Sequence, residues 1–331
     1  MKRCALVIIG SRSDEREQGL DAGPRVAQAL RRRGWEVEEI DGGMPHHVVA
    51  RLMTTDPGTI VVPIAYGVGG GEDGLFHSVA SLLGIPCAGP NGTTGGLSMD
   101  KYLFQLAVDG LFKDDPSVRT PKTCVFTESS PLDQSRQRVA ALGSPLIVKP
   151  NFSGASLGVS IATTPEEALD LVRALLPSAH KVLCQELVTP ADELSVTVLD
   201  RSHGPEVLPI VWIQRSGMVY GYDDKNQPDA NQRHIIPAPI DQRRADDIIA
   251  ACRRLHDAIG ACGLFRYDVL VTTREIVFLE VNSIPGLMQT SIAPDAAKAA
   301  GITYDSLIED FALSSLLGSR SEKVSTEECE R

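Results

Sequence analysis

The sequence predicts an α/β protein with more than one domain, and three observations lead to that prediction. The chain has 331 residues, which exceeds what one small hydrophobic core holds, so two or three domains are expected. Apolar runs alternate with amphipathic segments near the N-terminus, as in a parallel sheet covered by helices. Two late apolar runs, 262–265 and 276–279, lead into polar residues and predict buried strands that carry charged groups.

The first region, residues 1–95, has the pattern of a parallel α/β layer. Its first helix ends at Gly34, and a glycine- and threonine-rich stretch at 91–96 marks the boundary with the next region. The predicted elements are strands at 4–9, 35–40 and 59–65 and helices at 20–33 and 75–83.

The central region, residues 96–188, combines strands with a glycine-rich loop at 151–158. A helix starts near Ser98, and a second has Pro165 near its start and two glutamates in its first turn, which complement the helix dipole. The predicted strands are at 123–127, 146–149, 159–162 and 182–188.

The third region, residues 189–318, turns to longer strands and ends with the two charged ones. The predicted elements are strands at 194–199 and 207–213, a helix near 241–260, and the strands that contain 262–265 and 276–279. Residues 319–331 are polar, and we expect a disordered tail there.

Composition excludes several classes of protein. The net charge of −11 argues against a broad nucleic-acid-binding surface, and no apolar run approaches the ~20 residues of a membrane helix. The apolar stretch at 4–9 is too short for a signal peptide, so a first strand is favoured. The seven cysteines are scattered and form no Cys-x-x-Cys pair, which predicts a reduced, cytoplasmic protein without structural zinc.

Two glycine motifs suggest functions that their surroundings do not support. Residues 69–74 match Gly-x-Gly-x-x-Gly, but a dinucleotide-binding fold needs an acidic residue about 20 positions later, where 90–95 offers none. Residues 154–158 match the Gly-x-Ser-x-Gly elbow of hydrolases, but that elbow leads into a helix and the residues after Gly158 read as a strand.

Charged residues follow the two late apolar runs and predict a metal site. Arg266 and Asp268 close the first run, and Glu280 and Asn282 close the second. Two carboxylates and an amide oxygen then converge, and hard oxygen ligands of this kind suit Mg²⁺, which also takes ligands from water and phosphates. The alternative is a surface cluster of ion pairs, which leaves the upstream lysines and glycine loop without a common partner.

The glycine loop and three lysines predict a phosphate site. The loop 151–158 can turn its backbone N–H groups toward an anion, and it directly follows Lys149. Lys101 and Lys225 are each typical of solvated surface charges when taken alone. Together with carboxylates of the Mg²⁺-binding type, the three lysines favour a triphosphate.

An extended segment at 185–188, Gln-Glu-Leu-Val, is suited to an adenine ring. It offers one backbone N–H and one C=O per residue, and its apolar neighbours can enclose a flat ring. Glu193, a few residues later, can accept hydrogen bonds from ribose hydroxyls. The alternative reading is a strand edge with a glutamate that faces solvent.

Taken together, these motifs resemble the ATP-grasp ligases, and specifically the D-alanine–D-alanine ligase family, from about residue 4 to residue 312. The segments that carry the resemblance are 70–74 (Gly-Gly-Glu-Asp-Gly), 97–101, 147–150, 266–268, 280–286 and 291–294. The resemblance implies a three-domain ATP-grasp architecture with ATP between the central and C-terminal domains. The domains are expected at 1–95, 96–188 and 189–318.

The resemblance also implies roles for individual residues. The residues implied to contact ATP are Lys101, Lys149, Ser153, Gln185, Glu186, Val188, Glu193, Lys225 and Phe278. Two Mg²⁺ ions are implied on Asp268, Glu280 and Asn282, and catalytic roles are implied for Arg266, Gly286 and Ser156. The loop 151–158 would cover the site, and the enzyme would be a homodimer that binds ATP and amino acids.

The amino-acid pocket departs from the family pattern. Glu15, which would pair with a substrate ammonium, is retained. The serine and tyrosine that hold this glutamate in the family are replaced by Ala155 and Asn226, and a family histidine is replaced by Tyr66. Charge-assisted bonds of about 1.5–3 kcal/mol each are thereby lost. Expected substrate contacts are Glu15, Tyr66, Asn226, Arg233, His234 and Ser291.

Three functions follow from this pattern. We expect an ATP-dependent carboxylate–amine ligase that joins two amino acids through an acyl phosphate, with substrates belonging to specialised metabolism, such as a glutamyl donor. The alternative is a housekeeping D-alanine–D-alanine ligase of peptidoglycan synthesis whose pocket has drifted neutrally. A third possibility is an ATP-binding protein that has lost catalysis, against which the retained Arg266, Asp268, Glu280 and Asn282 argue.

Overall fold

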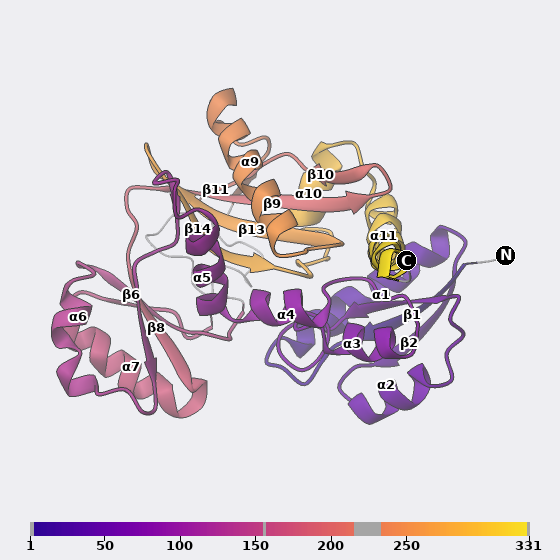
Figure 1. Ribbon diagram of the computed structural model, residues 1–331, viewed down its shortest axis with the longest axis horizontal. Helices are drawn as coiled ribbons and strands as arrows, with labels where there is room; N and C mark the ends of the chain where they lie inside the picture. The colour runs from indigo at the N-terminus through magenta and orange to yellow at the C-terminus, as the bar shows by residue number, and fades with distance from the viewer. Residues whose placement is uncertain (1–2, 155–156, 215–232, 330–331) are drawn as a thin grey trace.

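Three β-sheets organise the part of the chain that the structure describes (Figure 1). The computed structural model describes residues 3–154, 157–214 and 233–329. The N-terminal sheet, the central sheet and the C-terminal sheet follow one another along the chain, as the predicted α/β architecture requires. No helix of these described ranges is both long and apolar enough to cross a bilayer.

The N-terminal sheet is parallel, with strand order β2-β1-β3. Its strands are β1 (Cys4–Ile9), β2 (Glu36–Asp41) and β3 (Thr59–Ile64), and its helices are α1 (Arg16–Arg32), α2 (Pro45–Leu52) and α3 (Leu75–Leu82). Alternate residues of β1 face opposite helices: Val7 packs with α1, whereas Leu6 packs with α2 and α3. Helices therefore cover both faces, which explains why β1 and β3 are almost continuously apolar.

Two helices, α4 (Gly92–Met99) and α5 (Lys101–Leu111), lead to the antiparallel central sheet, whose order is β5-β8-β6-β7. Its strands are β5 (Thr123–Thr127), β6 (Leu146–Pro150), β7 (Ser160–Ala162) and β8 (Lys181–Glu186); the helical segments are η1 (Leu132–Gln134), α6 (Arg136–Ala140) and α7 (Pro165–Ala179). Thr164 caps α7 by accepting from the Glu167 N–H, and Pro165 begins the helix as predicted. Leu146 and Val148 pack under α7, so Ile147 and Lys149 face the opposite side.

The C-terminal sheet has the order β12-β11-β9-β13-β14-β4, with β10 paired to β9. Its elements are β4 (Val118–Arg119), β9 (Asp192–Arg201), β10 (Gly204–Val207), β11 (Val211–Gln214), β12 (Arg233–Ile235), β13 (Leu264–Val271), β14 (Ile276–Asn282), and the helices α9 (Gln242–Ala258), α10 (Ile292–Ala299) and α11 (Tyr304–Cys329). The single strand predicted at 207–213 is two strands in the structure. Pro209, which cannot donate to a ladder, lies in the break.

Segments from different predicted regions pack together. Helix α11 contacts α1 and β3, and its residues Leu307 and Phe311 belong to the same core as the N-terminal sheet. Strand β4 precedes the central sheet in sequence but pairs with β14. Helix α11 also continues to Cys329, so the tail expected to be disordered from residue 319 is helical over 319–329, a stretch without glycine or proline. The domain boundaries remain a prediction.

Candidate active site

A pocket of about 740 Å³ contains most of the predicted site residues. Its walls come from the N-terminal region, from β6 and β8 of the central sheet, and from β9, β13 and β14 of the C-terminal sheet. The predicted residues that line it are Glu15, Tyr66, Lys101, Lys149, Ser153, Gln185, Glu186, Val188, Glu193, His234, Arg266, Asp268, Glu280, Asn282, Gly286 and Ser291. Motifs that are far apart in the sequence therefore share one cavity.

Strand periodicity places the charged residues of β13 and β14 on the pocket face. Arg266, Asp268 and Leu270 alternate along β13 and all line the pocket. Across the ladder Arg266 is paired with Asn282, and Asp268 with Glu280. The two carboxylates are therefore direct cross-strand neighbours, as the sequence predicts.

Asp268 is buried and held by three side chains. Arg266 donates from Nε to Oδ1 at 3.0 Å and from Nη2 to Oδ2 at 2.8 Å. Asn282 Nδ2 donates to Oδ2 at 3.1 Å, and the Ser195 hydroxyl donates to Oδ1. The carboxylate is thus oriented by the sheet itself, since Ser195 on β9 is its partner in the ladder on the other side.

Two lysines bring positive charge to the same end of the pocket. Lys101 Nζ lies 3.4 Å from Glu280 Oε2 and donates to the Ser153 carbonyl at 2.5 Å. Burial lowers the pKa of Lys149 to about 8, an effect that Glu280 opposes and Lys101 reinforces. A phosphate beside Lys149 would favour its charged form, so this ammonium is suited to an anionic ligand.

The acidic residues fit a divalent cation chemically. Asp268 and Glu280 supply carboxylate oxygens on one face, and Asn282 supplies an amide oxygen beside them. These are hard donors of the kind that Mg²⁺ takes together with phosphate oxygens. Arg266 and Lys101 offset the two negative charges on the protein side.

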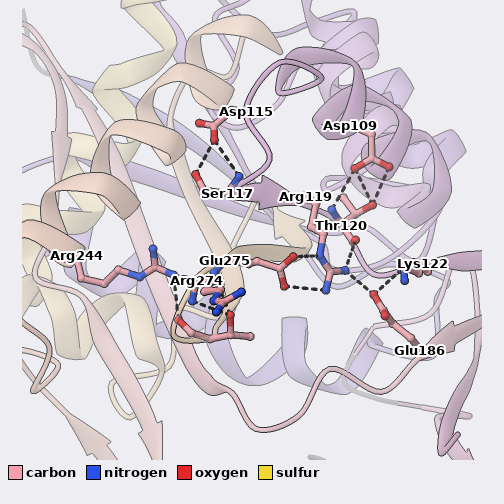
Figure 2. A network of polar contacts seen from close by, with 11 residues as sticks. Asp109, Asp115, Ser117, Arg119, Thr120, Lys122, Glu186, Arg244, Arg274 and Glu275 are labelled. Atoms are coloured by element: carbon pink, nitrogen blue, oxygen red, sulfur yellow. Dashed lines mark hydrogen bonds and ion pairs between the residues drawn. The ribbon is translucent and has the colours of Figure 1, made fainter. Parts of the chain in front are cut away.

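The end of β8 forms the opposite end of the pocket. Gln185 Nε2 donates to Thr123 Oγ1 at 2.9 Å, so this side chain is engaged within the central sheet. The carboxylate of Glu186 accepts from the Lys122 N–H at 2.9 Å and from the guanidinium of Arg119 (Figure 2). The Glu186 N–H also donates to the Lys122 carbonyl at 3.0 Å, whereas among the described residues the N–H of Val188 donates to no backbone carbonyl.

Two carboxylates lie at the end of the pocket near the N-terminal region. The Gly67 N–H donates to Glu72 Oε2 at 2.6 Å, and burial together with the nearby Glu15 raises the pKa of Glu72 to about 8. Glu72 is therefore mainly protonated at neutral pH. Gly154 of the glycine loop packs directly against Glu15, where a Cβ would collide with the carboxylate.

Tyr66 forms the wall next to these carboxylates. Its hydroxyl accepts from the Leu287 N–H at 3.1 Å, and its carbonyl accepts from the hydroxyls of Ser11 and Ser13 at 2.7 Å. Burial raises the pKa of Tyr66, so it remains a neutral phenol. Side chain and backbone are thus both fixed, and Tyr66 joins the N-terminal region to the segment after β14.

Gly286 and Ser291 lie together where α10 begins. A Cβ on Gly286 would come within 2.9 Å of Ser291 Oγ, so the backbone approaches closely at this point. Ser291 is the residue that precedes the first turn of α10. The positive end of that helix dipole therefore lies beside the predicted oxyanion-stabilising backbone.

Two of the predicted contacts do not line the pocket in this structure. Phe278 is fully buried and stacks on Phe112 with ring centroids 6.1 Å apart, because a β-bulge at Leu279 reverses the alternation of β14. Leu279 lines the pocket in its place. Arg233, the first residue of β12, is exposed, whereas His234 lines the pocket and its Nδ1 lies 2.7 Å from Asp295 Oδ2.

The predicted site residues and those of the structure do not coincide completely. Ser156, Lys225 and Asn226 lie outside the described residues. Conversely, Glu72 and Arg119 are not among the predicted site residues. Glu72 belongs to the quoted glycine motif at 70–74, and its burial was the missing information; Arg119 has no local signal, because its partners are distant in sequence.

The fold and this site define a class of enzymes, the ATP-grasp ligases that form C–N bonds. The family model "D-ala D-ala ligase C-terminus" matches residues 120–312. The D-alanine–D-alanine ligase of Gloeobacter violaceus is 35% identical over 309 residues, 92% of this chain and 96% of that protein. That of Fervidobacterium nodosum is 31% identical over 307 residues, with the same two coverages.

Solved structures show the same fold. D-alanine–D-alanine ligase from Bacillus anthracis complexed with ATP matches with a TM-score of 0.80 at 22% identity, covering 97% of this chain and 99% of that one. VanG D-Ala:D-Ser ligase from Enterococcus faecalis matches with a TM-score of 0.78 at 22% identity, covering 95% and 100%. The chain belongs to the D-alanine–D-alanine ligase family and is an ATP-dependent ligase.

Proposed function

We propose that this enzyme is a D-alanine–D-alanine ligase. It transfers the γ-phosphoryl group of ATP to the carboxylate of one D-alanine, which gives an acyl phosphate and ADP. The amine of a second D-alanine then attacks the carbonyl carbon and releases phosphate. The proposal is supported by relatives of that name matched along nearly their whole length, and this favours the housekeeping alternative over a ligase of specialised metabolism.

The observation that carries the proposal is the convergence of cations and carboxylates at one end of the pocket. Lys101 and Lys149 are positioned to bind phosphate oxygens, and each lies in the field of Glu280. Arg266 and the backbone at Gly286 line the same cavity, where they stabilise negative charge that develops on oxygen. Glu15 is suited to hold the substrate ammonium.

We further propose that Asp268, Glu280 and Asn282 hold Mg²⁺. The metal would neutralise charge on the phosphoryl group during transfer. Titration of the enzyme with Mg²⁺ in the presence of a non-hydrolysable ATP analogue tests this directly: tight nucleotide binding should require the metal. Equal binding in excess chelator would contradict it.

A second candidate, ligation of a different amino acid, is favoured by Tyr66. The phenol is buried in the pocket wall, and its hydroxyl accepts from the Leu287 N–H, so it occupies a different volume at the amino-acid end of the pocket than an imidazole would. This changes the shape and polarity that the substrate meets. The reaction type is unaffected, because the phosphate end contains the residues that the family pattern implies.

A screen of amino acids for ADP and phosphate release distinguishes these functions. Release with D-alanine alone supports the proposal, and release only with another pair supports the second candidate. An inactive protein that still binds ATP would instead support the third possibility, a protein that has lost catalysis. The cytoplasmic location and the homodimer remain predictions.

A further inference from the structure

A guanidinium outside the pocket joins the two sheets that enclose its β8 end. Arg119 belongs to β4 of the C-terminal sheet, and Glu186 ends β8 of the central sheet. Arg119 Nη1 donates to Glu186 Oε1, and its other edge donates to Glu275 from Nε at 2.8 Å and from Nη2 at 3.0 Å (Figure 2). One side chain therefore bridges two carboxylates from separate sheets.

The backbone that carries Arg119 is itself fixed. Thr120 donates to Asp109 of α5 from its N–H at 3.1 Å and from its hydroxyl at 3.0 Å. On the other side of Arg119, the Ser117 carbonyl accepts from the Ile276 N–H at 2.7 Å. The guanidinium thus projects from a rigid base, so that its position determines where its partners lie.

At one end of this bridge, Glu186 holds the end of β8 in place. The Glu186 N–H donates to the Lys122 carbonyl at 3.0 Å, and the Lys122 N–H donates back to the Glu186 carboxylate at 2.9 Å. With Arg119 on the same carboxylate, the last residue of β8 is held through both its backbone and its side chain. The segment 186–188, which lines the pocket, starts from this point.

At the other end of the bridge, Glu275 holds the turn that leads to the opposite wall of the pocket. Glu275 lies in the turn between β13 and β14, one residue before Ile276. Val277 pairs with Leu270, and Leu270 pairs with Glu193 on β9. Leu270 and Glu193 both line the pocket, so the turn held by Arg119 is adjacent to the wall that faces the β8 segment.

We propose that Arg119 is a positioning residue for the purine end of ATP, which sets the spacing between the 186–188 backbone and the wall formed by Leu270 and Leu279. The inference rests on the proposed placement of ATP in this pocket. Bidentate contact with a carboxylate fixes direction as well as distance, which a single ammonium does not do. The three side chains are only partly exposed, at 26% for Arg119, 16% for Glu186 and 33% for Glu275, so solvent weakens the bridge without removing it.

The test compares Arg119→Met with the control Arg244→Met. Arg244 donates to the carbonyls of Thr272 and Glu275 at 3.1 and 2.7 Å, so it anchors the same turn but does not reach β8. We expect R119M to raise the KM for ATP about tenfold with kcat changed less than about threefold, the signature of lost binding common to ground and transition states. R244M should lower Tm and leave the KM for ATP unchanged.

Two more variants and a binding measurement make the result decisive. Arg119→Lys keeps the charge but cannot contact both carboxylates with the bidentate geometry of a guanidinium, and Glu275→Gln weakens one of the two contacts. The KM for ATP of both variants should therefore lie between those of the wild type and R119M. If R119M does not fold, these two carry the test. Selectivity for ATP over GTP should be highest in the wild type, intermediate in these two variants and lowest in R119M. The reason is that the spacing between the 186–188 backbone and the opposite wall would no longer select one purine edge.

Titration with a non-hydrolysable ATP analogue separates failure of this inference from failure of the proposed function. If the wild type binds and R119M binds equally well, the role of Arg119 is overturned. An equal rise in KM for ATP in R119M and R244M would also overturn it, since general loosening of the turn would then suffice. A wild type that does not bind the analogue would overturn the proposed function, and this inference with it.

Discussion

The phosphate end and the amino-acid end of the pocket balance their charges differently. At the phosphate end, Asp268 is paired with Arg266, and Glu280 lies 3.4 Å from Lys101. At the amino-acid end, Glu72 lies in the field of Glu15, and its pKa is raised to about 8. The first end is thus organised by its own ion pairs, whereas the second is organised by burial, and a substrate ammonium would complete its electrostatics.

The largest effect that this comparison predicts is the loss of a carboxylate at the phosphate end. Glu280→Gln should lower turnover by at least about a hundredfold, because charge stabilisation of the transferring phosphoryl group is lost. The fold should persist, since Glu280 is partly exposed and belongs to no hydrophobic core. Steady-state turnover and a thermal melt measure the two properties.

Glu166→Gln, on the exposed surface of α7, is the control and should keep full activity. Near-normal turnover in Glu280→Gln would remove the metal assignment. Unfolding of the variant would instead show that Glu280 is needed for the fold. Its effect on turnover could then not be assigned to the phosphate end alone.

A change at the amino-acid end should act on one substrate only. Tyr66→Phe removes the hydroxyl that accepts from the Leu287 N–H and leaves that buried donor unpaired. The unpaired donor lowers the free energy of unfolding by about 1–3 kcal/mol. We expect the KM for the amino acid to rise about tenfold, with the KM for ATP unchanged. Equal rises in both constants would mean that the two ends are coupled through the segment after β14.

A smaller effect is expected from the support of Asp268. Ser195→Ala removes one of three donors to this carboxylate, and Arg266 and Asn282 remain. We expect kcat to fall about threefold to tenfold, and added Mg²⁺ to restore part of the loss, because outer partners of metal ligands tune affinity. Thr197→Ala, two residues away on the same buried strand, is the matched control. A Ser195 variant that Mg²⁺ does not rescue would assign the serine to packing alone.

The same comparison explains what the sequence was able to predict. Arg266, Asp268, Glu280 and Asn282 follow strand periodicity, so their convergence was foreseeable from the apolar runs. Phe278, which the resemblance implies to contact ATP, lies in the core instead, because a single-residue bulge at Leu279 interrupts the alternation of β14 and nothing in the local sequence marks it.

The amino-acid end and the bridge between the sheets lie beyond such reasoning. Glu72 acquires its unusual pKa from burial by residues of the N-terminal and C-terminal regions, including Ser283, which donates to its carbonyl at 2.9 Å. Arg119 meets partners 67 and 156 positions away in the chain. Tertiary packing alone brings these groups together, so the glycine motif at 70–74 contains Glu72 without indicating its burial, and no motif indicates the partners of Arg119.

The smallest predicted effect is a change in how stability depends on pH. The pKa of Glu72 is about 8 in the folded protein, against an ordinary value of 4.5. Between these values the unfolded chain has released a proton that the folded protein still holds, so the contribution of Glu72 to the stability of the wild type falls as pH rises through this window and levels off above pH 8. Glu72→Gln keeps an acceptor for Gly67 and has no such proton. Its Tm relative to wild type should therefore increase by a few degrees from pH 5 to pH 8.

Thermal melts in matched buffers measure this difference, with Glu166→Gln as the control. The pKa of Glu166 is lowered by its contact with Arg136, so its charge is constant across that range and the control difference should be flat. A flat difference for Glu72→Gln as well would mean that Glu72 ionises normally. In that event the amino-acid end would hold a charged Glu72 next to Glu15, and a cation supplied by the substrate would be needed to offset the carboxylates.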